Sequence, residues 1–361
     1  MYEPKFPEYL LKASSDERIA FFENIRMRHA MLEPIEEILE SIWPHLKRAP
    51  EHQLHGILYG HTATGKTSFC KNIRDKYPRV AGAEVDQVPV LWFRCPLPFT
   101  PKEFYHHGLK AYEAPAPSEA LWVRDDMARI RREKQTEGAL KRRFFELAQR
   151  CETKVWIIDE IQHIRYGQGI GYSIERALDQ LKHLADEAGV MLLLAGTYQT
   201  LELFGQNTQL TRRFRRMLLD RYRDFDADQP TDPANRPWLE VIQSLENWLP
   251  LPQPSQLTKY APVLQHYTFG LIGLLKPLLT EALRLALKTE RQIVTSEILQ
   301  KCRLSDRELK EMETQIGRDE RDDGMEPSAC TATSSRPPKR PQGSRRSSGP
   351  KPRRPVEDAV A

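Results

Sequence analysis

The sequence predicts an α/β fold in which a parallel sheet is flanked by helices. Apolar segments at 54–59, 88–95, 154–159 and 190–196 alternate with helical patterns, which is typical of a parallel sheet. The first segment leads into a glycine-rich octapeptide, Gly60-His61-Thr62-Ala63-Thr64-Gly65-Lys66-Thr67, and a helical pattern from Ser68 to Lys76 follows it. A strand, a glycine-rich loop and a helix in this order would place phosphates at a helix N-terminus.

The octapeptide fits the phosphate-binding pattern G-x-x-x-x-G-K-[ST], known as the P-loop. Its glycines let backbone N–H groups converge on the phosphates, Lys66 would reach the β- and γ-phosphates, and the Thr67 hydroxyl would ligate Mg²⁺. The expected nucleotide contacts are the consecutive residues Gly60, His61, Thr62, Ala63, Thr64, Gly65, Lys66, Thr67 and Ser68.

A second element agrees with the P-loop. The segment from Lys154 to Glu160 is an apolar run that ends in two acids, as a buried parallel strand would. Asp159 would hold Mg²⁺ through water, and Glu160 would orient the attacking water. The alternative is a buried strand with two solvated acids at its tip, but the upstream P-loop favours hydrolysis.

Composition narrows the class of protein. The chain has 361 residues, is 40% hydrophobic and carries a net charge of +4, with basic residues concentrated at its end. Its five cysteines show no C-x-x-C pairing, which indicates reduced thiols in a cytoplasmic protein and no zinc site. The N-terminus lacks a signal-peptide pattern, and no apolar run approaches the roughly 18 residues of a membrane span.

The chain divides into four predicted parts. Ser14 to Glu17 is a good helix start, and a clean amphipathic helix is expected from Ser173 to Ala188 before Gly189. Only helical patterns occur from about 232 to 303, and from Glu326 the chain is rich in Pro, Ser and Arg. The predicted parts are a helical N-terminal segment at 1–50, a P-loop core at 51–230, a helical lid at 231–303 and a polar, disordered basic tail at 304–361.

An all-helical part after a P-loop sheet resembles the lid of AAA+ ATPases, which implies ATP as the nucleotide. In AAA+ folds, a polar residue at the tip of the strand between the P-loop and Asp-Glu strands senses the γ-phosphate. Thr197, at the end of the apolar segment from Val190, fits that role, with Tyr198 less favoured. An ordinary strand-to-turn residue is the competing interpretation.

The next segment, from Thr211 to Arg216, is dense in arginine. This density predicts an arginine finger that neutralises charge on the γ-phosphate of a neighbouring subunit, with Arg213 the leading candidate and Arg212 the next. Such a finger would place the active site between subunits. A nucleic-acid-binding patch or a solvated helix is the competing interpretation.

Taken together, the layout resembles the TniB/TnsC-type AAA+ ATPases, which select targets for DNA transposons. Besides the P-loop, the resemblance lies in Arg18-Ile19 with Phe22 and Arg26, Asp159 to His163, Leu194 to Thr197 with Leu210 to Phe214, and Phe269 to Gly273. It spans residues 15 to 300. The sequence departs from many AAA+ proteins at Gly273, where they carry a lid arginine; Lys276 is the nearest basic residue.

The resemblance implies that ATP-bound subunits assemble as a ring or helical filament on double-stranded DNA. The homo-oligomer would recruit a transposase and work with target-selector proteins, and hydrolysis would dissolve it. DNA contacts would be largely to phosphates. Basic residues after the second predicted strand are the candidates, although each is also explained as a solvated side chain. The first are Lys102 and Lys110, on a helix predicted from Pro101 to Tyr112; then come Arg131 and Arg132 with Lys134, and then Arg165.

Three other classes compete with this hypothesis. A helicase loader or replication initiator would share the P-loop and acids but normally carries the lid arginine. A nucleotide-gated scaffold would bind ATP and barely turn over, against which Glu160 argues. A P-loop small-molecule kinase is disfavoured because it needs neither the Asp-Glu strand end nor an all-helical lid.

Overall fold

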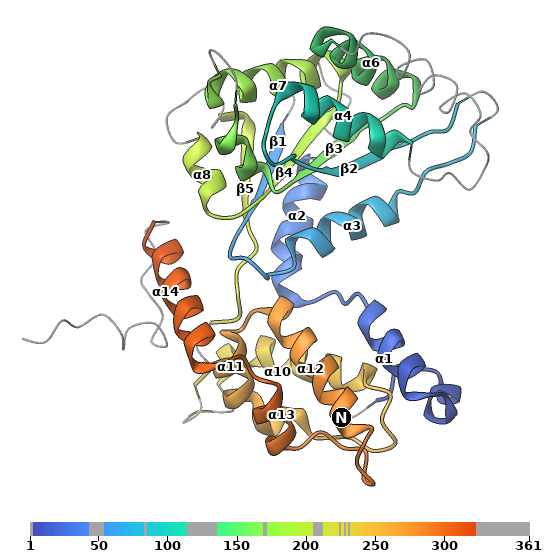
Figure 1. Cartoon of the computed structure of the whole chain (residues 1–361), viewed down its shortest axis with the longest axis vertical. Coiled ribbons are helices and arrows are strands. Elements are labelled where there is room, and N and C mark those ends of the chain that lie inside the picture. The colour runs from blue at the N-terminus through green and yellow to red at the C-terminus, as the bar shows by residue number, and fades with distance from the viewer. Residues whose placement is uncertain are drawn as a thin grey trace, which may run out of the picture.

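The computed structural model describes residues 3–42, 54–82, 85–113, 136–168, 172–204, 212–223, 225–226, 229 and 232–322. In this part of the chain, an α/β unit containing the sheet stands above a cluster of helices from the lid (Figure 1). The predicted DNA-binding residues Arg131, Arg132 and Lys134 lie outside these ranges, as does the tail from 323 onward.

Five described strands form one parallel sheet in the order β2-β3-β4-β1-β5. Every residue of β1, β3 and β4 is buried, because helices cover both faces of the sheet. The strand bounds are β1 His55–Tyr59, β2 Val90–Arg94, β3 Val155–Asp159, β4 Met191–Ala195 and β5 Phe214–Leu218.

Alternate side chains of the sheet point into two separate cores. On one face, Trp156, Ile158 and Leu194 pack with helices α4, α6 and α7. On the other face, Val155 and Leu193 pack with helices α2 and α3, which Figure 1 shows across the sheet from α4 and α6. These helices are α2 Glu33–Ile42, α3 Lys66–Lys76, α4 Pro101–Tyr112, α6 Glu137–Arg150 and α7 Ile174–Ala188; the short α8 Gln199–Phe204 follows β4.

The lid forms a third core around the buried Trp238. Helix α1 joins this core through Ile19 and Phe22, so the N-terminal segment packs on the lid as well as on the sheet. A capping box at Ser14 and Glu17 starts α1. The bounds are α1 Ser15–Asn24, α10 Arg236–Trp248, α11 Ala261–Thr268, α12 Ile272–Ala286 and α13 Ser296–Cys302.

Two sequence predictions need correction. The arginine-rich segment continues into an edge strand, β5, where a solvated helix had been one interpretation; Phe214 and Met217 are buried while Arg215 and Arg216 stay exposed. The predicted disordered tail from 304 begins instead with a helix, α14 Asp306–Asp322. Leu309 and Ile316 bury an apolar stripe of α14 against the lid, which gives this charged segment a reason to fold.

No helix in the described ranges is both long and apolar enough to cross a membrane.

Candidate active site

The P-loop lies where β1 ends and α3 begins, at the carboxyl edge of the sheet. Gly60 has a φ of 152°, and a Cβ there would lie 2.1 Å from the Leu219 carbonyl oxygen of the neighbouring strand end. Gly65 has a φ of 102° directly before α3. Both positions therefore require glycine, which explains the pattern on which the nucleotide prediction rests.

Lys66 is buried inside the loop. Its Nζ donates to the carbonyl oxygens of Gly60 at 2.9 Å and His61 at 2.5 Å. Burial lowers the pKa of Lys66 to about 8, against the opposing charges of Glu160 and Asp159. A nucleotide phosphate would add a further opposing charge close to this buried ammonium group.

Thr67 and Asp159 come together as expected for a magnesium site. The Thr67 hydroxyl donates to Asp159 Oδ2 at 2.8 Å, and burial raises the pKa of Asp159. A hydroxyl and a carboxylate are oxygen donors of the kind that Mg²⁺ prefers, and Mg²⁺ commonly uses one or two protein groups plus phosphates and water. The pair thus fits a nucleotide-bound Mg²⁺, which would neutralise phosphate charge.

Glu160 follows β3 in a left-handed conformation, with a φ of 57°. Its side chain is held by Gln162, whose Nε2 donates to Glu160 Oε2. The other end of the same amide, Gln162 Oε1, accepts from the backbone N–H of Thr197 at 3.3 Å. Glu160 and the tip of β4 are therefore connected through one side chain that sequence reasoning did not single out.

Thr197 follows β4, which pairs with β3, and its backbone N–H donates to Gln162 beside the Asp-Glu strand end. Its Oγ1 atom is buried and has no hydrogen-bond partner within the described ranges. A buried hydroxyl without a partner costs free energy, so a phosphate oxygen arriving near this point would satisfy it.

Arg213 lies far from the P-loop of its own chain. It precedes β5, whose first residue pairs with His55 at the start of β1, whereas the P-loop follows the end of β1. Five residues of strand at about 3.3 Å each separate the two edges by about 17 Å. Arg213 Nη1 instead donates a hydrogen bond to Asp186 Oδ2 at 3.1 Å. The side chain of Arg212 is exposed.

The lid touches the P-loop directly. The Gly273 N–H donates to the Ala63 carbonyl at 2.7 Å, and a Cβ at Gly273 would lie 2.5 Å from that oxygen. Lys276 turns away, because its Nζ donates to the carbonyls of Glu23, at 2.8 Å, and Ile25. Neither residue offers a cation to the nucleotide in this arrangement.

The end of α14 also reaches the P-loop, which the sequence analysis did not foresee. Glu320 is buried and accepts from Arg221 Nε at 2.9 Å and Nη2 at 2.8 Å. In the P-loop, His61 Nδ1 lies 3.3 Å from Asp319 Oδ2, and the His61 ring packs on the ring of Tyr198. Burial would raise the pKa of Glu320, but the His61 ring, whose Nε2 lies 3.7 Å from Glu320 Oε1, and the Arg221 charge outweigh it and lower the pKa to about 2. The helical spacing of Leu309, Met312 and Ile316 was the available sequence signal for this helix.

The basic residues proposed to bind DNA differ in whether their side chains are already paired with an acid. Lys102 and Lys110 are exposed near the two ends of α4. Arg165 forms an ion pair of 2.6 Å with Glu202. The structure therefore leaves the α4 lysines as the more available of the described candidates.

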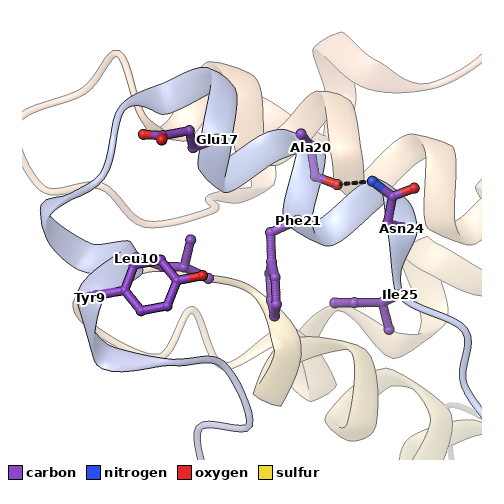
Figure 2. A pocket seen from close by; sticks show the side chains of 7 residues that line it. All are labelled: Tyr9, Leu10, Glu17, Ala20, Phe21, Asn24 and Ile25. Carbon is purple, nitrogen blue, oxygen red and sulfur yellow. Dashed lines mark hydrogen bonds between the residues drawn. The ribbon is translucent and has the colours of Figure 1, made fainter.

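A separate hollow of about 460 Å³ lies between the N-terminal turn and α1, where Tyr9, Leu10 and Phe21 line it (Figure 2). The Asn24 amide on its rim is engaged with the Ala20 carbonyl at 2.8 Å. Glu17 is the charged residue among those lining it, so the hollow lacks the P-loop's phosphate-binding groups.

The sheet order, the P-loop and the lid together define a P-loop ATPase of the AAA+ class. Residues 18–224, more than half of the chain, match the family model described as "Bacterial TniB protein". The chain therefore belongs to the TniB family, as its sequence resemblance predicted.

Solved structures agree on the fold. The Aeropyrum pernix ORC2 protein, described in ADPNP-ADP complexes, matches with a TM-score of 0.54 at 14% identity over 86% of this chain and 79% of that one. Cdc6p from Pyrobaculum aerophilum matches with a TM-score of 0.53 at 12% identity over 78% and 69%. Among curated proteins there is no match.

Proposed function

We propose that this TniB-family ATPase is an ATP-dependent, DNA-binding regulator of transposition. Subunits carrying ATP and Mg²⁺ oligomerise on double-stranded DNA in the cytoplasm, as a ring or filament. The assembly recruits and activates a transposase at a target chosen with target-selector proteins, and hydrolysis drives disassembly. Membership of the TniB family supports the link to transposition.

The observation that carries the oligomeric part is the position of Arg213. Arg213 lies where the strands of the sheet begin, whereas the P-loop of its own chain lies where they end, and Arg213 is paired with Asp186. An arginine there reaches a phosphate only if that phosphate belongs to another subunit. Head-to-tail contacts of this kind generate rings or open filaments.

Lys102 and Lys110 support the proposed DNA binding, because exposed lysines on one helix offer point charges to backbone phosphates.

The structure of the lid argues against the alternative function, that of a replication initiator. It would normally use a lid arginine, and at Gly273 the backbone lies too close to Ala63 for any side chain.

Subunit mixing tests the proposal. Arg213→Ala should bind ATP but hydrolyse it slowly, and Glu160→Gln should bind ATP and form stable DNA-bound oligomers that do not turn over. Mixed in equal amounts with duplex DNA, the two variants should regain hydrolysis. Roughly a quarter of random head-to-tail interfaces would combine an intact site with an intact arginine.

Arg215→Ala, an exposed arginine of the neighbouring strand, is the matched control and should hydrolyse like wild type. If the mixture hydrolyses no faster than the average of its components, Arg213 does not act between subunits. Full activity of Arg213→Ala alone would place the finger elsewhere.

A further inference from the structure

Both ends of the Gln162 amide form hydrogen bonds within the candidate site. The residue lies in the 3-10 turn Ile161–Tyr166 directly after β3, and its side chain is buried. One end of the amide donates to Glu160 Oε2, and the other end accepts from the Thr197 N–H at 3.3 Å. Among the described residues, none forms a hydrogen bond to Glu160 Oε1, so this second carboxylate oxygen can accept from a water.

Gly196 makes room for this bridge. A Cβ at Gly196 would lie 2.3 Å from Gln162 Oε1 and 2.2 Å from Thr200 Oγ1. Gly196 does not have a positive φ, so its backbone conformation is open to other residues. The close approaches of the Thr200 hydroxyl and the Gln162 amide are therefore the structural reason for glycine at this position.

Glu160 needs external support because of its backbone. A non-glycine residue at a φ of 57° is in a sparsely populated conformation, which persists only where its surroundings hold it. Asp159 Oδ1 accepts from the Glu160 N–H at 3.1 Å and fixes the main chain. Gln162 fixes the side chain, and it does so with a neutral group that brings no competing charge.

We propose that Gln162 is a positioning residue that sets the Glu160 carboxylate relative to the tip of β4. The inference rests on the proposed role of Glu160 in orienting the attacking water. A shift of Thr197 on contact with the γ-phosphate would then move the Gln162 amide, and with it the Glu160 carboxylate. Ground-state ATP binding does not use the bridge, whereas hydrolysis does.

Gln162→Met tests the inference, because methionine keeps the volume and removes both hydrogen bonds. ATP turnover on duplex DNA should fall about 10- to 100-fold, the scale of a misplaced catalytic group. The dissociation constant for a fluorescent ATP analogue should stay within about threefold. Gln168→Ala, an exposed glutamine two residues past the same turn, is the matched control and should leave both quantities unchanged.

Gly196→Ala reaches the same bridge from the other side. The new methyl should displace the Gln162 amide and reproduce the turnover loss, and the double variant should be no slower than the worse single variant. Melting curves of all variants establish that they fold. Normal turnover in both single variants, additive losses in the double variant, or a loss of ATP affinity equal to the loss of turnover would overturn the inference.

Glu160→Gln separates this inference from the proposed function. If that variant hydrolyses ATP normally, the assignment of Glu160 fails and the role of Gln162 fails with it. If Glu160→Gln is inactive and Gln162→Met is normal, only the role of Gln162 is wrong.

Discussion

Replacing Glu320 by glutamine should release the end of α14 from the P-loop. Glu320 and Arg221 are almost completely buried, at 0% and 1% side-chain exposure, and two guanidinium nitrogens lie 2.9 Å or less from one carboxylate oxygen. Removing one partner of a buried ion pair costs about 3–5 kcal/mol, because the other charge stays behind uncompensated. The glutamine oxygen still accepts a hydrogen bond, so we expect about 3 kcal/mol.

The assay is hydrogen exchange of the α14 amides, with denaturant unfolding alongside. If α14 opens as a local unit, a loss of about 3 kcal/mol accelerates its exchange by about 100-fold. Glu311→Gln is the matched control on the same helix. Its partner Arg307 is 87% exposed, and such pairs contribute about 0.3–0.5 kcal/mol.

Equal exchange rates in Glu320→Gln and Glu311→Gln would refute the reasoning. They would mean that the buried pair does not hold α14 on the P-loop.

The remaining predictions concern nucleotide, DNA and pH. Lys66→Ala should abolish ATP binding by calorimetry and ATP-dependent assembly, and assembly like wild type would contradict nucleotide gating. Reversing the charges of Lys102 and Lys110 should weaken binding to every DNA sequence and reduce the salt slope by roughly 0.9 per lost phosphate contact, while the exposed Lys301→Glu in the lid should not. The folded-state pKa of Glu320, about 2, lies below its usual 4.5, so its stabilisation is present above pH 4.5 and lost as the pH falls toward 2. Unfolding at stepped pH should show this loss in wild type and not in Glu320→Gln.

Buried strands could be predicted well from sequence because their apolar runs are continuous. The segments at 54–59, 154–159 and 190–196 became β1, β3 and β4 within a residue at each end. The capped helix before Gly189 was also confirmed, since its signals are local. β5 was missed because an edge strand pairs on one side only and carries exposed arginines. α14 was missed because its charges outweigh a narrow apolar stripe.

The same division holds for the site. The P-loop and its two glycines form a continuous sequence pattern, and Thr67 meets Asp159 because parallel strands end at one edge. The Gln162 bridge and the burial of Glu320 depend on residues 35 and 99 positions apart. Such contacts exist only after the chain has folded. The assigned roles of Glu160, Thr197 and Arg213 stay predictions.

The most direct measurement of the central claim is mass photometry followed by negative-stain microscopy of the wild-type chain. Samples would contain a non-hydrolysable ATP analogue, ADP or no nucleotide, each with and without duplex DNA. We predict rings or filaments on DNA with the analogue, and dispersed subunits with ADP or without nucleotide. Single subunits under every condition, or the same assemblies without nucleotide, would contradict the account.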